Sequence, residues 1–299
     1  MSNILVSGLV NFETTCSVHG FPIEYAPIDY NFFGVQTAVS GVGFNVAKAL
    51  TTLGNHVDIA TLLANDLAGN IAVRELNSAG IGYSCITYSL KETPASTVLY
   101  DETGRRKIYC DLKDIQETAY DFDGLDLSPY RAVIACNINF SRPLLHKAKT
   151  AGIPVATDVH TLSDLHDGYN REFMECADLL FLSDEAIPCT PEEFLHDIAR
   201  EYGNQIIVLG CGGKGAVMYV RKEDKMYRQN AANLGTPVNT VGAGDALLSA
   251  FVSLWCEGLP PAECLRRAQL FAAAKIRHSG AANGFITRAE LEHLAAHGQ

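Results

Sequence analysis

A glycine-rich segment near the carboxyl end of the chain carries the residues best suited to chemistry. It reads Gly242-Ala243-Gly244-Asp245 and runs into a stretch of apolar residues. The glycines free the backbone for a tight turn, and the apolar spacing after Asp245 predicts a helix, so unpaired amide N–H groups should converge at its N-terminus. Such a terminus attracts anions. A carboxylate in the same turn can accept a proton from a group that attacks a bound phosphoryl group, which indicates phosphoryl transfer.

This segment resembles the carboxy-terminal signature of the ribokinase-like, PfkB-type carbohydrate kinase family, in which Asp-Thr-x-Gly-Ala-Gly-Asp precedes an apolar helix. The resemblance implies that Asp245 is the general base and contacts the substrate. It also implies that the amides of Gly242, Ala243 and Gly244 form the anion hole, with ATP as phosphoryl donor and Mg²⁺ as its metal. For this segment taken alone, a glycine-rich helix cap with an incidental acid is the alternative.

A second signature lies near the amino terminus. The segment Ser40-Gly41-Val42-Gly43-Phe44-Asn45 resembles the family's Gly-Gly-x-Gly-x-Asn, which opens the first helix. Small residues let a sugar approach the backbone, and an Asn side chain can both donate to and accept from hydroxyls. Upstream, Glu13 stands where relatives carry an Asp that holds sugar hydroxyls, and it is one methylene longer. The substrate-binding residues that the resemblance implies are Glu13, Gly41, Gly43 and Asn45.

The sequence motifs for nucleotide binding are less distinct. The segment Leu209–Gly215 resembles the family's strand-end Leu-Gly-x-x-Gly, which meets ATP. It is not a P-loop, because Lys214 is followed by Gly215 and the required glycine-to-lysine spacing fails. Residues 272–283 fall where the family closes over adenine and lines a monovalent cation site with carbonyls, although alanine-rich helix packing explains Ala272–Ala274 equally well. The nucleotide-binding residues implied are Gly210, Gly212, Gly215, Gly242, Gly244 and Asn283.

Two departures from the family pattern concern metal ions. Asn239 stands where most relatives have Asp, and a neutral side chain removes a charge from a site that hard cations favour, so monovalent cation activation is not expected here. The family's Asn-x-x-Glu motif has no clean copy. Its best candidate is Ser183-Asp184-Glu185, with Glu185 holding Mg²⁺ through water, while Asp184 as a helix cap is the alternative.

Some polar residues keep two interpretations. Asp158 and His160 follow a strand end that faces the expected cleft, where they either touch substrate or form a loop pair. Arg105 is expected to keep a sheet edge soluble, whereas substrate contact by Arg106 stays open. The aromatic residues of Tyr25–Phe33 either stack a nucleobase or pack ordinarily.

His293 and His297 share one face of a predicted helix, but the sequence offers no third ligand beside them. Zinc sites take at least three protein ligands. We therefore expect a solvated tail rather than a metal site.

The elements that must position these residues follow an alternating pattern. Short apolar runs bounded by Gly, Pro or Asp alternate with longer amphipathic stretches, which is typical of strands and crossover helices. The predicted strands are Ile4–Leu9, Val57–Leu62, Ala132–Cys136, Val155–Asp158, Leu179–Leu182 and Ile206–Leu209. The predicted helices are Phe44–Leu53, Ala68–Ala79, Arg142–Ala151, Arg171–Ala177, Pro191–Tyr202, Ala246–Cys256 and Pro261–His278. The sequence predicts an α/β fold with a doubly wound, mostly parallel sheet flanked by helices, ribokinase-like by resemblance.

Two regions break this rhythm. Residues 17–36 are rich in aromatics and prolines, and residues 97–113 alternate apolar and polar types around Glu102-Thr103-Gly104, which predicts a hairpin. We expect a small β-sheet lid, with strands inserted within about 12–38 and 81–113 of a single domain over 1–299. A lid excludes water during group transfer, and its open strand edges favour a homodimer through the lid. An appendage that serves only dimerisation is the alternative.

Composition sets outer limits. The 299 residues carry 23 Lys and Arg against 34 Asp and Glu, a formal net charge of −11, which argues against broad binding to nucleic acid or to anionic membranes. The nine cysteines are scattered, without a Cys-x-x-Cys pair, and no apolar run approaches a membrane span. We therefore expect a reduced, cytoplasmic protein.

The leading functional expectation is an ATP-dependent kinase that phosphorylates a primary hydroxyl of a small sugar. A nucleoside kinase of the same family, acting on adenosine, inosine, cytidine or pseudouridine, is the first alternative. A catalytically silent sugar-binding regulator on the same fold is the second. An oxidoreductase is excluded, because no Gly-x-Gly-x-x-Gly follows the first strand.

Overall fold

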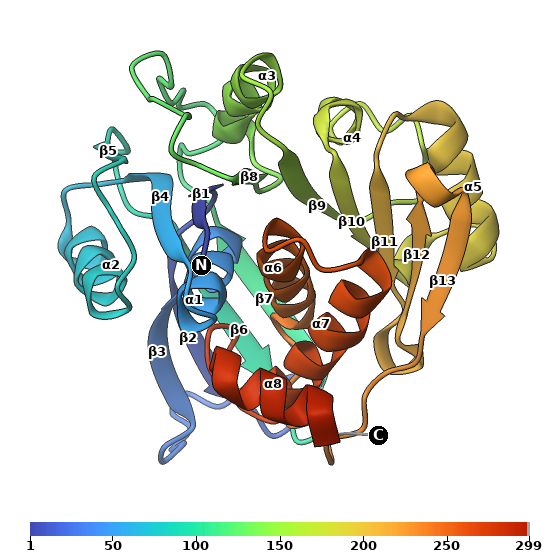
Figure 1. Cartoon of the computed structure of the whole chain (residues 1–299). Helices are drawn as coiled ribbons and strands as arrows, with labels where there is room; N and C mark the ends of the chain where they lie inside the picture. The colour runs from blue at the N-terminus through green and yellow to red at the C-terminus, as the bar shows by residue number, and fades with distance from the viewer. Residues whose placement is uncertain (104, 298–299) are drawn as a thin grey trace.

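Two β-sheets organise the part of the chain that the computed structural model describes, residues 1–103 and 105–297 (Figure 1). Within those residues the larger sheet has nine strands. Adjacent strands from β5 to β11 are parallel, whereas β12 pairs antiparallel with both β11 and β13. In spatial order the strands are β13 (Lys225–Gln229), β12 (Ala216–Val220), β11 (Ile206–Gly210), β10 (Leu179–Ser183), β9 (Val155–Thr161), β8 (Ala132–Ala135), β1 (Asn3–Ser7), β4 (His56–Leu63) and β5 (Ile86–Tyr88). The predicted mostly parallel sheet is confirmed.

Helices cover both faces of this sheet. One face packs against α1 (Val42–Thr52), α2 (Leu67–Ser78), α6 (Ala243–Cys256), α7 (Pro261–Lys275) and α8 (Arg288–His297). The other packs against α3 (Arg142–Thr150), α4 (Arg171–Cys176) and α5 (Pro191–Glu201). Strand residues alternate between the two cores, so Ile4 and Val6 belong to the first and Leu5 to the second. The doubly wound arrangement thereby follows from the strand pattern.

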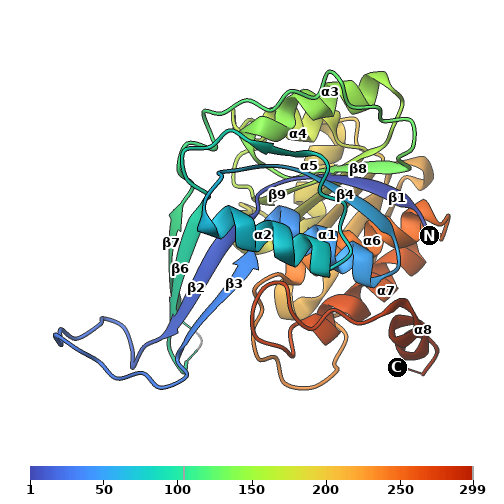
Figure 2. The same ribbon diagram turned by 90° about the vertical axis from the view of Figure 1, so that its left-hand side faces the viewer.

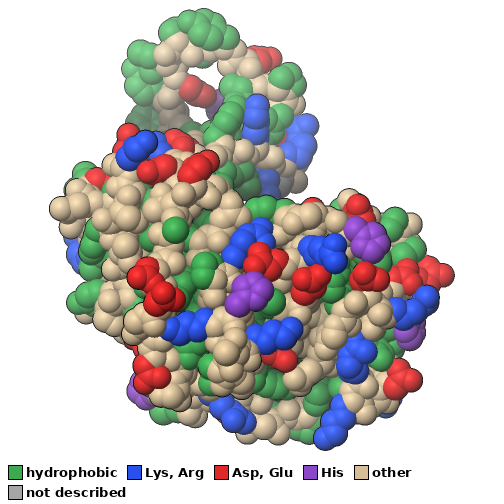
Figure 3. Space-filling view, turned by 90° about the horizontal axis from the view of Figure 1, so that it is seen from above, with side chains coloured by type: hydrophobic (Ala, Val, Ile, Leu, Met, Phe, Trp, Pro, Cys, Tyr) green, Lys and Arg blue, Asp and Glu red, His purple; other side chains and the backbone are tan. Residues whose placement is uncertain are grey.

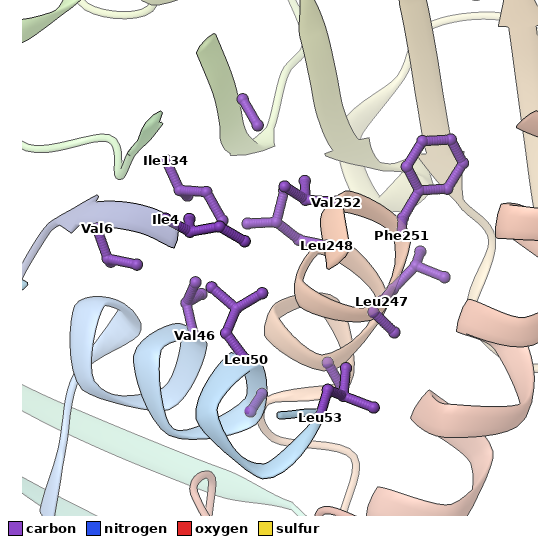
Figure 4. Packing of buried hydrophobic residues seen from close by; sticks show 14 of the residues in the cluster. Ile4, Val6, Val46, Leu50, Leu53, Ile134, Leu247, Leu248, Phe251 and Val252 are labelled. Carbon is purple, nitrogen blue, oxygen red and sulfur yellow. The ribbon is translucent and has the colours of Figure 1, made fainter. Parts of the chain in front are cut away.

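Helices α1 and α6 lie side by side at the centre of the first core. Figure 4 shows Val46 and Leu50 of α1 pointing toward Leu248 and Val252 of α6, with Ile4 of β1 beside them. Two buried polar contacts also hold α6 to α1 and to the turn that follows α1. Asn55 Nδ2 donates to Ser253 Oγ at 2.8 Å, and Ser249 Oγ donates to the Val46 carbonyl at 3.4 Å. This packing fixes the N-terminus of one helix relative to that of the other.

The smaller sheet has the order β3-β2-β6-β7, and its inner pair β2 and β6 is parallel while the other pairs are antiparallel. Its strands are β2 (Asn11–Ser17), β3 (Val35–Ser40), β6 (Ala95–Tyr100) and β7 (Arg106–Asp111). The predicted small sheet beside the main one is therefore present. Of the predicted hairpin turn, Gly104 lies outside the described residues.

Residues 18–34, all of them described, contain no strand and form an arm that projects from the tip of β2 and β3 (Figure 2). Seen from above, the arm stands clear of the body and carries many hydrophobic side chains (Figure 3). On the rest of that face, basic and acidic side chains are interspersed. The most exposed arm residues are Tyr25, Tyr30, Phe32 and Phe33.

Some elements differ from expectation. The first strand ends at Ser7 rather than Leu9, because the chain turns away there toward α1 and β2. The antiparallel pair β12 and β13 was not predicted. His293 and His297 are exposed on α8, as expected of solvated residues, but the helix itself is docked by the buried Leu291 and by Arg288, whose guanidinium donates to Ser253. Within the described ranges, none of the helices is long and apolar enough to cross a membrane.

Gly43→Ala tests how tightly α1 is packed. A Cβ at Gly43 would lie 2.5 Å from the Gly8 carbonyl carbon and 2.7 Å from its oxygen. Alanine is the better helix former, but backbone atoms cannot rotate away, so we expect the free energy of unfolding to fall by about 1–3 kcal/mol. Urea unfolding followed by circular dichroism measures this. Gly203→Ala is the control, because nothing lies within 4 Å of its Cβ position; equal stability of the two variants would contradict the packing argument.

Candidate functional site

Asp245 lies in the first turn of α6 and is buried, with 8 % of its surface exposed. Gly242 caps the helix in the left-handed conformation, at φ 79°, and a Cβ there would lie 2.5 Å from the Ala281 carbonyl oxygen. Glycine is thus required both by the turn and by the close approach of the loop after α7. The Asp245 carboxylate accepts a hydrogen bond from Asn45 Nδ2 at 2.8 Å. Two predicted signatures, far apart in the sequence, therefore meet.

Asn45 is held in place by the way α1 begins. Gly41 has φ 100°, and a Cβ on it would lie 2.5 Å from the Leu9 carbonyl oxygen. The same carbonyl accepts the Phe44 amide at 3.3 Å. Gly41 and Gly43 must therefore be small in order to pack against residues 8–11. From the sequence we expected their small size to let a sugar approach the backbone. Direct contact of either glycine with a substrate stays a prediction.

The turn before α6 presents amide groups. The Ala243 amide donates to the Thr240 carbonyl at 3.2 Å, so it is already partnered. Among the described residues, the amides of Gly242, Gly244 and Asp245 have no hydrogen-bond acceptor. These three donors, at the positive end of the α6 dipole, can receive an anion. We call residues 242–245 the anion-binding turn.

A second carboxylate faces this turn. Asp158, near the end of β9, places Oδ2 3.5 Å from the Cβ position of Gly244. Its Oδ1 accepts the backbone amide of His160 at 2.7 Å, and the His160 ring nitrogen lies 3.9 Å from the same oxygen. His160 has φ 61°, in the left-handed region that non-glycine residues rarely adopt. The two residues therefore pair with each other within β9 and also lie beside the candidate base.

Burial and nearby charges shift the pKa of Asp245. The pKa is raised to about 6; burial is the main cause, because it disfavours the charged form, and the negative charge of Asp158 acts in the same direction. The hydrogen bond from Asn45 and the positive charges of His160 and Lys275 act in the opposite direction. A carboxylate with such a pKa is ionised at neutral pH and still basic enough to accept a proton.

The small sheet also contributes polar side chains to this region, through Asn11 and Glu13 of β2. Burial raises the pKa of Glu13 on β2, while hydrogen bonds with Ser40 and Ser96 oppose the shift. Asn11, two residues before Glu13 and on the same strand face, donates to Ser96 Oγ at 2.9 Å. Among the described residues, the buried amide oxygens of Asn11 and Asn45 have no donor. Buried acceptors without donors fit the hydroxyl groups of a ligand.

Sequence reasoning missed Asn11, Ser96 and Lys275. The signal for Asn11 was available, since alternation along a strand puts it on the face of Glu13. Lys275 is the last residue of α7 and has no exposed surface. Nothing in its local sequence distinguishes it from a solvated lysine near a helix end.

The predicted nucleotide residues come from three places: the end of β11 with the turn that follows it, the start of α6, and the loop after α7. Gly210 ends β11, and Gly212 adopts φ 53° in the turn that follows. A Cβ at Gly215 would lie 2.0 Å from the Gln229 carbonyl oxygen, so that glycine is required by strand packing. Asn283 donates to the Ser279 carbonyl at 3.2 Å, in the loop that touches Gly242. Their contact with a nucleotide remains a prediction.

Glu185 is exposed in a short 3-10 turn after β10, and its amide donates to Ser183 Oγ at 3.3 Å. Its neighbour Asp184 lines a cavity of about 440 Å³ together with Lys214. Within the described ranges, there is no group of three or more His, Cys, Asp or Glu side chains that could hold a metal ion. Mg²⁺ bound to a nucleotide takes one or two carboxylates plus phosphates, so Glu185 as a water-mediated partner is compatible with this arrangement.

Of the residues left open, Arg106 is exposed at the start of β7, opposite Tyr100. Arg105 pairs with the buried Asp101 at 2.9 Å and so stabilises the hairpin. The aromatic arm projects away from the body of the molecule (Figure 2). Its rings therefore face solvent, and do not line the site of their own chain.

Comparison with known proteins gives consistent matches. Residues 146–288 match the family described as pfkB family carbohydrate kinase. The chain is 24 % identical over 301 residues to the acarbose 7(IV)-phosphotransferase of an Actinoplanes species, covering 99 % of both chains. It is 24 % identical over 288 residues to the pseudouridine kinase of Escherichia coli, covering 89 % of this chain and 88 % of that one. The solved structure of the microbiome-derived acarbose kinase Mak1 superposes with a TM-score of 0.89 at 23 % identity, with 99 % of both chains covered, which confirms the fold.

The electrostatic account of Asp245 predicts its titration. Asp158→Asn removes a nearby negative charge, so we expect the pKa of Asp245 to fall by about one pH unit. Carbon-13 NMR of labelled aspartate carboxyl groups measures this, with the Asp245 signal assigned by its loss in Asp245→Asn. Asp164→Asn is the matched control, because Asp164 accepts the His166 amide in the same way, at 2.8 Å, but is exposed. An Asp245 pKa that is unchanged or raised by Asp158→Asn would refute the account.

Proposed function

From the match of residues 146–288 to the pfkB family carbohydrate kinases, we propose that the chain is an ATP-dependent phosphotransferase acting on a primary hydroxyl of a small sugar. The observation that carries the proposal is the buried carboxylate of Asp245 in the first turn of α6, bonded to Asn45 and next to free backbone amides. Base and anion site thus belong to one helix turn, which is what in-line phosphoryl transfer requires.

In the proposed reaction, Asp245 accepts the proton of the attacking hydroxyl. Asn45 fixes one carboxylate oxygen through its amide, so the other stays available to the substrate. The free amides of the anion-binding turn stabilise the charge on the transferring group, aided by the α6 dipole. Because these donors are set before substrate binds, no reorganisation is needed during transfer.

ATP and Mg²⁺ are implied by the family. Mg²⁺ bound to ATP would neutralise charge on the phosphates. Glu185 would hold the metal through water, and Gly210, Gly212, Gly215 and Asn283 would line the nucleotide. Two neighbour relations support this: Ser183, which precedes the turn of Glu185, pairs with Gly210, and the loop that carries Asn283 lies against Gly242.

The acceptor side favours a polyhydroxylated substrate. Glu13, Asn11 and Asn45 offer a carboxylate and two unpartnered amide oxygens, and Asn11 is tied to Ser96. Each of these acceptors is suited to a sugar hydroxyl. A nucleoside also carries ribose hydroxyls, and one relative is a pseudouridine kinase, so nucleosides are the alternative class to test.

The small sheet is proposed to act as the lid of this site. Its inner strand carries Asn11 and Glu13, so closure over a sugar would bring their polar atoms to the substrate and exclude water. We also propose a homodimer formed through this sheet. The support is the projecting arm, whose rings at Phe32 and Phe33 are 83 % and 97 % exposed. Large exposed apolar patches are typical of interaction surfaces.

The base assignment predicts that Asp245→Asn lowers kcat by about 10²-fold or more. Asparagine keeps the shape and can still accept from Asn45, so sugar binding should change little. ADP release measures turnover, and titration calorimetry measures sugar binding, with ribose, fructose, acarbose, adenosine, inosine, cytidine and pseudouridine as acceptors. Asp164→Asn serves as the control.

Full turnover by Asp245→Asn would show that another group is the base. If none of the acceptors is phosphorylated by the wild-type protein, the kinase proposal fails. Sugar binding without ADP or phosphorylated product would instead support a silent binding protein on this fold.

The dimer proposal predicts that Phe32→Ser combined with Phe33→Ser shifts the protein to monomers, because it removes two adjacent, highly exposed rings of the arm. Light scattering after size exclusion gives the mass. Tyr88→Ser is the control, since Tyr88 is 55 % exposed on β5, an edge strand of the main sheet. A wild-type monomer, or a dimer that survives the double substitution, would refute an interface through the arm.

A further inference from the structure

Lys275 is a charged side chain buried without any exposed surface. It ends α7, and its ammonium group donates to the carbonyl oxygen of Val241. Burying an ammonium group is unfavourable unless acceptors and negative charges compensate it. Here the negative charges of Asp245 and Glu13 favour its charged form, so that burial lowers the pKa only to about 8. The group is thus mainly cationic at neutral pH.

The ammonium is bonded to the residue just before the anion-binding turn. Val241, whose carbonyl it holds, immediately precedes Gly242. The amides of Val238 and Asn239 both donate to the Ile276 carbonyl, at 2.8 and 3.0 Å. Two neutral hydrogen bonds and one bond from an ammonium group therefore fix residues 238–241 to the end of α7. The bond from the ammonium group is the one nearest in sequence to the anion-binding turn.

An inorganic monovalent cation, which the family resemblance implies in this region, does not fit these residues. Asn239 is neutral, and its Oδ1 already accepts the Val241 amide at 2.8 Å. The Ile276 carbonyl accepts two amides, and the Val241 carbonyl accepts Lys275. The oxygens that would coordinate a cation are occupied by protein donors, and a protein ammonium supplies the positive charge.

We propose that the Lys275 ammonium serves as a built-in monovalent cation, holding the Val241 carbonyl and thereby positioning the anion-binding turn. Lys275 is a positioning residue, since it acts through Val241 and not on the substrate. A tethered ammonium is always present, so the rate of the enzyme does not depend on potassium. This inference rests on the proposed kinase activity, but concerns only how the turn is held.

The wild-type protein provides the first test. Once an acceptor from the panel is turned over, kcat is compared in potassium chloride and in tetramethylammonium chloride at equal ionic strength. We expect the two rates to agree within about twofold. Activation by potassium of more than about tenfold would overturn the inference. Absence of turnover in both salts is a failure of the proposed function, and is thereby distinguished from a failure of this inference.

Two substitutions at Lys275 provide the second test. Lys275→Met removes the charge but fills the space, and should lower kcat about tenfold or more without rescue by added cations. Lys275→Ala removes the charge and opens the space, so potassium or ammonium ions should restore part of its kcat. A purely structural role would not give cation rescue in one variant and none in the other.

Lys147→Met is the matched control, because Lys147 Nζ also donates to backbone carbonyls, those of Phe122 and Asp123, and packs on the opposite face of the sheet. Its kcat should stay unchanged. Wild-type turnover by Lys275→Met, or a loss in Lys275→Ala that neither ion restores, would overturn the inference. If the Lys275 variants do not fold, the wild-type salt comparison decides alone.

Discussion

The hydrogen bond between Asn45 and Asp245 is the interaction on which the rest of this structure depends. It joins the first turns of α1 and α6 at 2.8 Å, inside the protein. Both helices can begin there because glycines at 41 and 242 let their backbones approach the Leu9 and Ala281 carbonyls. A neutral amide donor stabilises the carboxylate less than a cation would, so Asp245 stays ionised and still basic. The apolar core between the helices then keeps the two residues aligned.

This arrangement places like charges together. Asp245 and Asp158 face the same turn, and Glu13 lies close enough for its charge to act on Lys275. The buried ammonium of Lys275, bonded to the Val241 carbonyl, is acted on by the charges of Asp245 and Glu13. The negative total charge of the chain is therefore compatible with phosphate binding, because backbone amides and Lys275 supply positive potential locally, without a basic surface.

The sequence reveals the parts of the site that are local. The turn at 242–245 and the start of α1 at 41–45 carry their signals within a few residues, through glycine spacing and apolar periodicity. Lys275 reaches the site from the end of α7, and only the fold brings it to Val241. A lysine in the last turn of an alanine-rich helix is normally solvated, which is why Lys275 gave no sign of burial. The strand β12 was missed although Ala216–Val220 is a short apolar run after Gly215, the same signal that predicted the other strands. The strand β13 has no such run, because it is only half-buried.

The central claim is that one helix turn holds both the base and the anion site. A crystal structure with an acceptor sugar and a non-hydrolysable ATP analogue tests it most directly. The account predicts a substrate hydroxyl within about 2.6–3.2 Å of the Asp245 carboxylate, with the terminal phosphate at the amides of Gly242, Gly244 and Asp245. A hydroxyl held instead by Glu13 or Asp158, with the phosphate away from these amides, would contradict it.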